Sequence, residues 1–159
     1  MSSRARVVII GGGMLGIGTL YHLVESGWTD VILVEKGELT SGSTWHAAGL
    51  VPNYIGNLTY ARIHQEGVQR FKTLEAETGQ PSGWHGCGSV RLAVKPEDVD
   101  WFHHVRNVLE QAGVECNIIS PDEIARLHPL LDLEGVLMGA HTPGDGWVDP
   151  TTAANALAS

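Results

Sequence analysis

The chain has 159 residues, of which 43% are hydrophobic and 18% charged, a balance typical of an ordinary globular protein with one buried core. Its formal net charge is −8 and it has no basic block, so we expect neither nucleic acid nor an anionic membrane surface as a partner. The apolar runs are too short to span a bilayer, and Met1 to Ala5 leave no room for a targeting peptide before the first predicted strand. Cys87 and Cys116 match no metal or redox spacing, and we therefore expect a cytoplasmic protein with free thiols.

The first predicted elements are a buried strand, a glycine-rich turn and a helix. Residues 7–10 are four β-branched apolar residues in a row, which is typical of a parallel strand buried on both faces. Gly11, Gly13 and Gly16 follow at the spacing G-x-G-x-x-G and open a helix predicted over residues 14–26. In this motif the glycines make the tight turn, let the backbone approach a pyrophosphate, and allow close packing of helix on strand.

A second predicted strand completes a dinucleotide-binding pattern. Residues 31–34 are apolar and end at Glu35, which lies 24 positions after Gly11 (35 − 11), close to the spacing of an acid that binds a ribose. The glycine motif alone also fits a turn without a ligand, but the complete series of strand, turn, helix, strand and acid indicates dinucleotide binding. The helix N-terminus near Met14 and Leu15 supplies free N–H groups for the phosphates. A carboxylate favours a free ribose 2′-OH, and so FAD or NAD over NADP.

The segment after Glu35 departs from the regular pattern. Residues 36–51 are rich in glycine, hydroxyl-bearing and small residues, and they follow the carboxyl end of a parallel strand, where such sheets bind ligands. A connection of this length in a compact domain is usually functional, so we expect it to contact the cofactor. The residues that we assign to the cofactor here, besides Glu35, are Lys36, Gly42, Ser43, Thr44, Trp45, His46, Ala47, Ala48, Gly49 and Leu50.

The remaining elements interrupt the order of a parallel sheet. We predict helices over 57–78, 96–112 and from 121 to just before Pro129, strands over 89–94 and 136–138, a turn over 143–146, and a helix with Asp149 as N-cap. The strand over 89–94 alternates, which indicates antiparallel pairing outside the first sheet.

The expected fold class is therefore α/β, with a Rossmann-like FAD-binding βαβ unit and the start of an inserted α+β substrate region. The expected domains are residues 1–52 for the βαβ unit and flavin loop, 53–141 for the inserted region, and 142–159 for the return to the FAD-binding domain. Because the chain stops inside the last helical pattern, we expect it to be the truncated N-terminal part of something longer.

A resemblance to a known family rests on the segment Ser43–Leu50. It resembles the corresponding segment of dimethylglycine and sarcosine dehydrogenases, in the glycine/D-amino-acid oxidase group of flavoproteins. Supporting segments follow in the family's order at residues 11–16, 35–36, 88–92 and 143–150. The resemblance implies FAD rather than NAD, with His46 joined covalently to the flavin 8α-methyl carbon. It also implies hydride transfer from an N-methylated amino acid to flavin N5, followed by iminium hydrolysis to formaldehyde.

The same resemblance marks what this chain lacks. Family members are much longer and complete the FAD site with later strands, so the catalytic residues stay unknown here. Many add a folate-binding domain, so tetrahydrofolate would enter only through a downstream domain. The electron acceptor is left open between oxygen and an electron-transferring flavoprotein.

His46 also has a reading that is independent of the family. Ala47, Ala48 and Gly49 leave space around it for a planar ring, and neutral imidazole is a competent nucleophile. Two alternatives stay open: a noncovalent FAD amino-acid oxidase in which His46 is incidental, and a non-catalytic FAD-binding fragment.

Other polar residues carry weaker expectations. No two histidines have H-x-x-x-H spacing, so we expect no metal site. Arg91 faces either substrate or solvent, and Asp145 is expected to be a turn residue rather than a base.

Overall fold

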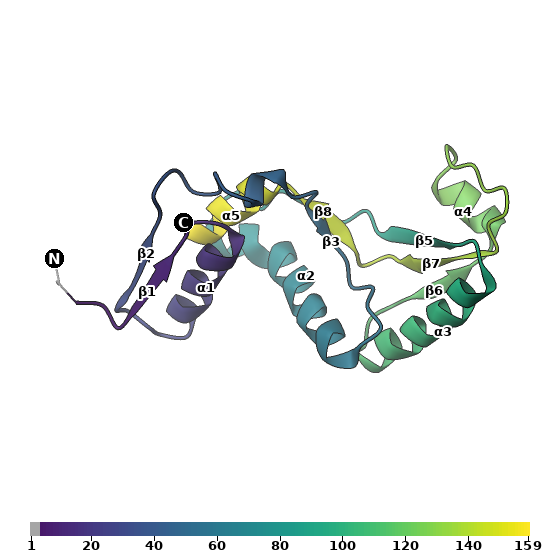
Figure 1. Ribbon diagram of the computed structural model, residues 1–159, viewed down its shortest axis with the longest axis horizontal. Coiled ribbons are helices and arrows are strands. Elements are labelled where there is room, and N and C mark those ends of the chain that lie inside the picture. Colours follow the sequence, from purple (N-terminus) through teal and green to yellow (C-terminus); the bar gives the residue numbers. More distant parts are fainter. Residues whose placement is uncertain (1–3) are drawn as a thin grey trace. The chain divides into compact units, whose positions relative to one another are not determined.

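The computed structural model describes residues 4–159 and is a mixed α/β structure (Figure 1). Its elements are β1 (Val7–Ile10), α1 (Met14–Glu25), β2 (Val31–Val34), the 3₁₀ turn η1 (Thr44–His46), β3 (Leu50–Val51), α2 (Leu58–Thr78), β4 (Trp84–His85), β5 (Ser89–Ala93), α3 (Pro96–Gln111), β6 (Asn117–Ile119), α4 (Pro121–Leu127), β7 (Met138–Thr142), β8 (Gly146–Val148) and α5 (Pro150–Ala158). The sequence analysis expected no targeting peptide because of the segment Met1 to Ala5. Part of this segment lies outside the described residues. Among residues 4–159, no helix is both long and apolar enough to cross a membrane.

Two compact units make up the described chain. The first comprises the described residues through Gly49, together with Phe71–Trp84 and Val148–Ser159. The second comprises Leu50–Arg70 and His85–Trp147. Residues 71–84, which the sequence assigned to the inserted region, therefore pack with the first unit. The division into domains at 1–52, 53–141 and 142–159 stays a prediction.

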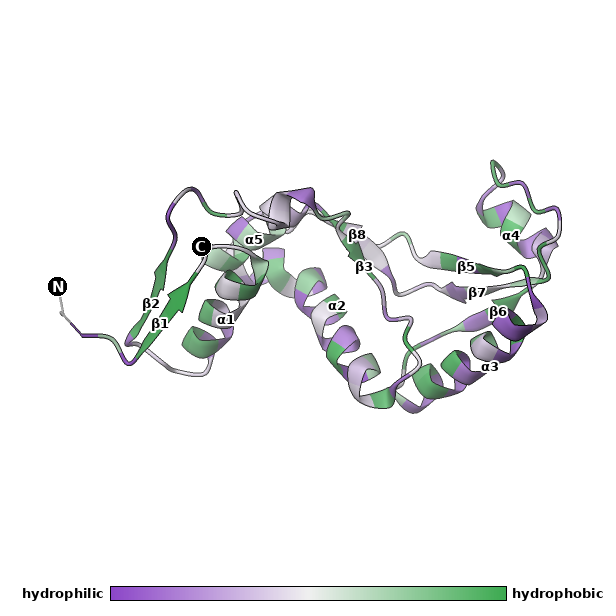
Figure 2. Cartoon of the chain, viewed as in Figure 1, coloured by the Kyte–Doolittle hydropathy of each residue, from purple (hydrophilic) through white to green (hydrophobic). Residues whose placement is uncertain are grey.

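The first unit contains the predicted βαβ motif. β1 pairs with β2 in parallel, in a register that runs from Val7↔Val31 to Ile10↔Val34, and α1 forms the crossover. Both strands consist of hydrophobic residues (Figure 2), but the expected burial of residues 7–10 on both faces is wrong for this structure: β1 and β2 have no fully buried residue, and Val8 and Ile10 are 54% and 88% exposed. The two strands form a sheet of two, which leaves much of their apolar surface uncovered. The motif confirms the predicted fold class.

The core of the first unit is formed by helices. The buried side chains of this core come from α1, the end of α2, and α5: Ile17, Leu74, Ala154, Ala156 and Leu157. The predicted N-cap of α5 is confirmed, because the Asp149 carboxylate accepts a hydrogen bond from the Thr152 N–H at 2.7 Å.

The second unit is built on an antiparallel sheet in the order β5-β7-β6, and α3 contributes to its core. Val90 pairs with His141, and Ile118 pairs with Ala140. The core residues are Ala61, Ala93, Phe102, Val105, Leu109, Cys116 and Ala140. The predicted antiparallel strand outside the first sheet is confirmed as β5.

The strand predicted over residues 136–138 was wrong in position. The chain turns at Gly135, where φ is +75°, and the Val136 N–H donates to the Leu133 carbonyl. The strand β7 begins only at Met138 and continues to Thr142. Its middle residues are small because Ile119 and Ile124 pack over Gly139, so the strand lacks the apolar pattern that predicts one.

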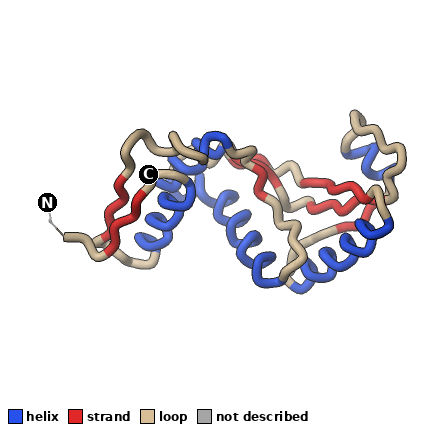
Figure 3. The backbone as a smooth tube through the Cα atoms, in the orientation of Figure 1, coloured by secondary structure: helices blue, strands red, loops and turns tan. Residues whose placement is uncertain are grey.

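A small sheet in the order β3-β8-β4 connects to the end of the flavin loop. Leu50 pairs with Trp147, and Val51 pairs with Gly146, both antiparallel. Residues 36–51, which the sequence sets apart from the regular pattern, are largely irregular (Figure 3), although η1 and β3 are short ordered segments within them.

Candidate cofactor site

The glycine turn after β1 is held in a conformation that few side chains would allow. Gly11 has φ +109°, a conformation that side chains disfavour. A Cβ on Gly16 would lie 1.9 Å from the Gly11 carbonyl oxygen, so only glycine permits this approach of helix to strand. A Cβ on Gly13 would lie 3.0 Å from Thr44 Oγ1. The positive φ of Gly11 and the close contacts at Gly13 and Gly16 account for the three positions of the motif.

Glu35 lies at the end of β2 and is bound by two backbone amides. Its Oε2 accepts from the Gly12 N–H at 2.6 Å, and its Oε1 accepts from the Gly37 N–H at 2.9 Å. The bond from Gly12 is the main reason that the pKa of this carboxyl lies below its ordinary value. Each carboxylate oxygen has a second lone pair, so an ionised Glu35 can still accept from both hydroxyls of a ribose.

The N-terminus of α1 meets the flavin loop at Thr44. Gly13 is the N-cap residue and has no side chain to satisfy the helix amides. Thr44 Oγ1 instead accepts from the Met14 N–H at 2.9 Å. Its hydroxyl hydrogen remains able to donate to a phosphate oxygen, while Leu15, which is 89% exposed, follows on the open side of the helix.

His46 is exposed in η1, with its ring held by two neighbours. The Nδ1 atom lies 3.2 Å from the Gly42 carbonyl oxygen. Because a carbonyl only accepts, Nδ1 donates in this contact, and in the neutral imidazole the lone pair is then on Nε2. The Trp45 ring lies against the imidazole, with centroids 3.8 Å apart and planes inclined by 37°. In its neutral form, His46 therefore presents Nε2 as a nucleophilic nitrogen.

The structure brings some predicted site residues together and leaves others open. Glu35, Gly12, Met14 and Thr44 are joined by hydrogen bonds within the first unit. The remaining loop residues of the prediction are exposed or partly exposed: Lys36, Gly42, Ser43, Trp45, His46, Ala47, Ala48 and Gly49. Leu50 is 75% exposed and belongs to the second unit.

Thr40 is a structural residue of this loop that the sequence did not reveal. It has φ +67°, unusual for a β-branched residue, and is only 4% exposed. Its N–H donates to the Gly12 carbonyl at 2.8 Å, so it fixes the loop against the glycine turn. A threonine carries no sequence pattern for this conformation.

Asp145 is a second residue whose role sequence reasoning missed. It is 1% exposed, and its Oδ1 accepts from both the backbone N–H and the Nδ2 of Asn53, at 2.7 and 2.8 Å. Its Oδ2 accepts from the hydroxyls of Ser89 and Thr142, at 2.6 and 2.5 Å. Asp145 thus does more than occupy the turn in which it was expected: its buried carboxylate joins three segments of the second unit by hydrogen bonds.

Arg91 interacts with an aromatic ring of the second unit. Its guanidinium carbon lies 4.3 Å from the centroid of the Tyr54 ring. Burial raises the pKa of Tyr54 to about 12, although the nearby Arg91 acts to lower it. The Tyr54 hydroxyl is buried and has no hydrogen-bond partner among the described residues.

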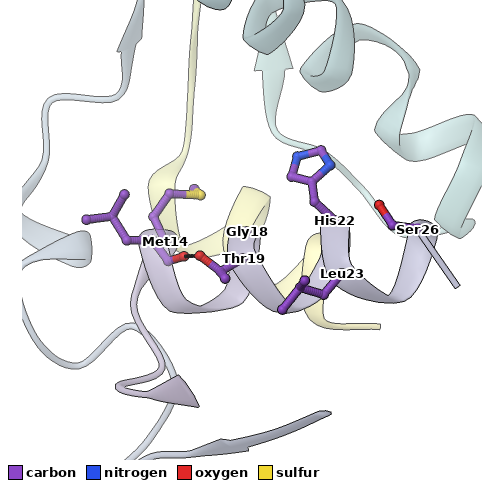
Figure 4. A pocket seen from close by; sticks show the side chains of 7 residues that line it. Met14, Gly18, Thr19, His22, Leu23 and Ser26 are labelled. Atoms are coloured by element: carbon purple, nitrogen blue, oxygen red, sulfur yellow. Dashed lines mark hydrogen bonds between the residues drawn. The ribbon is translucent and has the colours of Figure 1, made fainter. Parts of the chain in front are cut away.

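A shallow hollow of about 500 Å³ runs along α1, and Figure 4 shows its lining. The lining residues are Met14, Leu15, Gly18, Thr19, His22, Leu23 and Ser26. The Thr19 hydroxyl donates its hydrogen to the Leu15 carbonyl at 2.7 Å, so toward a ligand in this hollow it could only accept. Within residues 4–159, no three His, Cys, Asp or Glu side chains cluster as metal ligands would.

The sequence of residues 6–159 matches the model of the FAD dependent oxidoreductase (DAO) family. The chain belongs to this family. The ionised acid at the end of β2 and the glycine-only contact below α1 fit the ribose and pyrophosphate of FAD.

Several known proteins are similar to this DAO-family chain. It is 45% identical over 156 residues to rat dimethylglycine dehydrogenase, mitochondrial, covering 98% of the chain and 18% of that protein. It is 36% identical to human sarcosine dehydrogenase, mitochondrial, covering 99% and 17%. The crystal structure of L-proline dehydrogenase from P. horikoshii matches 99% of the chain and 41% of its own length, with a TM-score of 0.91 and 27% identity. The chain thus spans less than a fifth of the length of these two curated relatives.

Proposed function

We propose that this chain is the FAD-binding N-terminal part of a longer amine dehydrogenase. The proposed substrate is an N-methylated amino acid of the dimethylglycine or sarcosine type. The observation that carries the proposal is His46, exposed in η1 with its Nδ1 3.2 Å from the Gly42 carbonyl oxygen and followed by Ala47, Ala48 and Gly49. The identity of 45% to a dimethylglycine dehydrogenase supports the substrate class.

Each group proposed to contact FAD still has a lone pair or a hydrogen available to bond to it. Glu35 accepts from the adenosine ribose hydroxyls, because its two oxygens keep lone pairs beyond the bonds from Gly12 and Gly37. The amides of Met14 and Leu15 face the pyrophosphate, together with the Thr44 hydroxyl. His46 holds the flavin covalently through Nε2.

The bound FAD would accept a hydride from the N-methyl carbon, and water would then hydrolyse the iminium to formaldehyde and the demethylated amine. The chain's own contribution is to hold the His46 imidazole in a fixed orientation with Nε2 available to the flavin. The Gly42 carbonyl fixes the proton on Nδ1, and the Trp45 ring restricts rotation of the imidazole. The small side chains of Ala47 and Ala48 leave room for a planar ring.

The same proposal covers the electron acceptor of the flavin and the cellular location of the protein. An electron-transferring flavoprotein, or oxygen, would reoxidise the flavin, and tetrahydrofolate would enter only with a downstream domain. The names of the rat and human relatives place those proteins in mitochondria, whereas a cytoplasmic location for this chain remains our prediction from sequence.

The proposal is tested by comparing the 159-residue chain with the longer polypeptide that would carry it. The chain alone should bind FAD and produce no formaldehyde, because a flavin ring needs walls on both faces and donors near N1. The longer polypeptide should release formaldehyde from sarcosine or dimethylglycine with an artificial acceptor. Turnover by the 159 residues alone, or none by the longer polypeptide, would contradict the proposal.

A second candidate, a noncovalent FAD amino-acid oxidoreductase, is favoured by the likeness to L-proline dehydrogenase. In that case His46 is incidental, and secondary amino acids without an N-methyl group would be oxidised without formaldehyde. The third reading, a fragment that binds FAD without catalysis, predicts no amine oxidation from either polypeptide.

A further inference from the structure

The flavin loop contains one residue with a strained backbone. Thr40 has φ +67°, and among residues 4–159 it is the only residue other than glycine with a positive φ. A β-branched side chain disfavours this conformation, so it persists only where surrounding contacts hold it, and residues of this kind concentrate at binding sites. Thr40 is 4% exposed, with its hydroxyl 3.5 Å from the hydroxyl of Thr151 in the first turn of α5. The contacts that offset the strain therefore lie within the first unit.

This strained residue lies in a turn that has two possible forms. The Ser41 N–H donates to the Glu38 carbonyl at 3.3 Å, which makes residues 38–41 a β-turn with Thr40 in its third position. A type II turn has a positive φ there, whereas a type I turn has a negative φ that threonine adopts without strain. The two forms interconvert by rotation of the peptide group between the second and third residues, here Leu39 and Thr40. Because the N–H of this peptide belongs to Thr40, rotation would relieve the strain and turn that N–H away from its present acceptor.

The acceptor of the Thr40 N–H lies in the glycine turn. It is the Gly12 carbonyl oxygen, at 2.8 Å, while the N–H of Gly12 donates to Glu35. Four residues after Thr40, Thr44 Oγ1 accepts from the Met14 N–H. In the relaxed form the loop would lose its bond to Gly12. The strained form is therefore the one that presents the glycine turn and the flavin loop to FAD together.

We propose that Thr40 is a positioning residue for FAD, whose strained peptide closes the flavin loop onto the glycine turn. Thr40 acts through Gly12 and the loop rather than by a contact of its own with the cofactor. FAD that contacts both the glycine turn and the loop binds the closed form more tightly, and by linkage it raises the population of that form. The strain favours the relaxed form and so lowers the apparent affinity for FAD. The proposal requires only that this DAO-family chain binds FAD, so it goes beyond the proposed function and depends neither on the substrate nor on a covalent bond at His46.

The first test compares FAD affinities by fluorescence titration in the longer polypeptide with His46→Ala, in which FAD stays exchangeable. Thr40→Pro fixes φ at about −65° and removes the N–H, so FAD should bind about tenfold more weakly, the effect of one lost hydrogen bond. Thr40→Asn has a similar volume and tolerates a positive φ, so FAD should bind as tightly as before or up to about tenfold more tightly. Ser41→Ala is the control, because it removes a side-chain bond to the Glu38 carbonyl in the same turn and leaves the peptide before Thr40 unchanged. Its affinity should stay within about twofold.

Because a proline variant can misfold, a second measurement follows amide hydrogen exchange at position 40. In the longer polypeptide with His46→Ala, exchange of the Thr40 N–H should slow about tenfold when FAD binds, since FAD favours the form in which Gly12 accepts this hydrogen. In Thr40→Asn without FAD, exchange at this position should already be slower than with threonine, because the closed form then carries less strain.

Three results would overturn the proposal. FAD binding about tenfold weaker in Thr40→Asn would show that the threonine side chain, and not the strained peptide, is required. Unchanged affinity in Thr40→Pro, or exchange at position 40 that does not respond to FAD, would show that the turn is not linked to the cofactor. A polypeptide that shows the expected affinities and exchange but oxidises no N-methylated amine would support the role of Thr40 and refute the proposed function.

Discussion

Replacement of Asp145 by alanine should strongly destabilise the second unit. The carboxylate accepts four hydrogen bonds from buried groups, two of them from Asn53. After Asp145→Ala, the hydroxyls of Ser89 and Thr142, already 2.8 Å apart, can bond to each other. The two N–H donors of Asn53, a residue that is 3% exposed, lose their acceptor. At about 1–3 kcal/mol for each of the two buried unsatisfied donors, the unfolding free energy should fall by about 2–6 kcal/mol.

Two further variants make this prediction specific. Asp145→Asn should cost less than about 1.5 kcal/mol, because its carbonyl can accept from Asn53 while its amide donates to the two hydroxyl oxygens. Asp100→Ala, at an exposed position on α3, should change stability by less than about 0.5 kcal/mol. Urea unfolding followed by circular dichroism measures all three. A loss below about 1 kcal/mol for Asp145→Ala, or equal losses for the alanine and asparagine variants, would refute the reasoning.

Further predictions concern the cofactor site. Glu35→Gln should weaken FAD binding about tenfold to a hundredfold in a fluorescence titration, while Glu38→Gln in the same loop should not; equal affinities would argue against a ribose contact. Because folding lowers the pKa of Glu35 from 4.5, its contribution to stability is fully present above pH 4.5 and lost as the pH falls through the lowered value, a loss that Glu35→Gln should abolish in acid unfolding curves. Gly16→Ala should abolish FAD binding, since its Cβ would meet the Gly11 carbonyl at 1.9 Å, whereas Gly18→Ala, with no atom within 4 Å, should bind normally and gain up to about 1 kcal/mol of stability.

The part of the fold that sequence predicted is the part with local physical signatures. β1, α1 and β2 follow from apolar runs around a glycine turn, and the carboxylate of Glu35 lies where its spacing predicts. The helix predicted from residue 121 also forms, and a capping box begins it, in which the Glu123 carboxylate accepts from the Ser120 N–H at 2.8 Å. Such signals depend on residues close in sequence, so a pattern can reveal them.

The features that sequence did not predict depend on distant partners. Asp145 becomes a buried acceptor only because the fold brings Asn53, which is 92 positions away in sequence, within hydrogen-bond distance of it. Thr40 adopts a positive φ because its N–H reaches the carbonyl of Gly12. In β7, the packing of Ile124 on Gly139 replaces the apolar alternation that would have indicated a strand. Local propensity is overridden in each case by a tertiary contact.

The most direct test of the account is whether His46 carries the flavin. The longer polypeptide, loaded with FAD, is precipitated with acid, and the yellow flavin is measured in pellet and supernatant. We predict that flavin stays in the wild-type pellet and in that of His128→Ala, an exposed control on the second unit, and is released by His46→Ala. Release of all flavin from the wild-type pellet would contradict the covalent assignment and favour the noncovalent oxidoreductase.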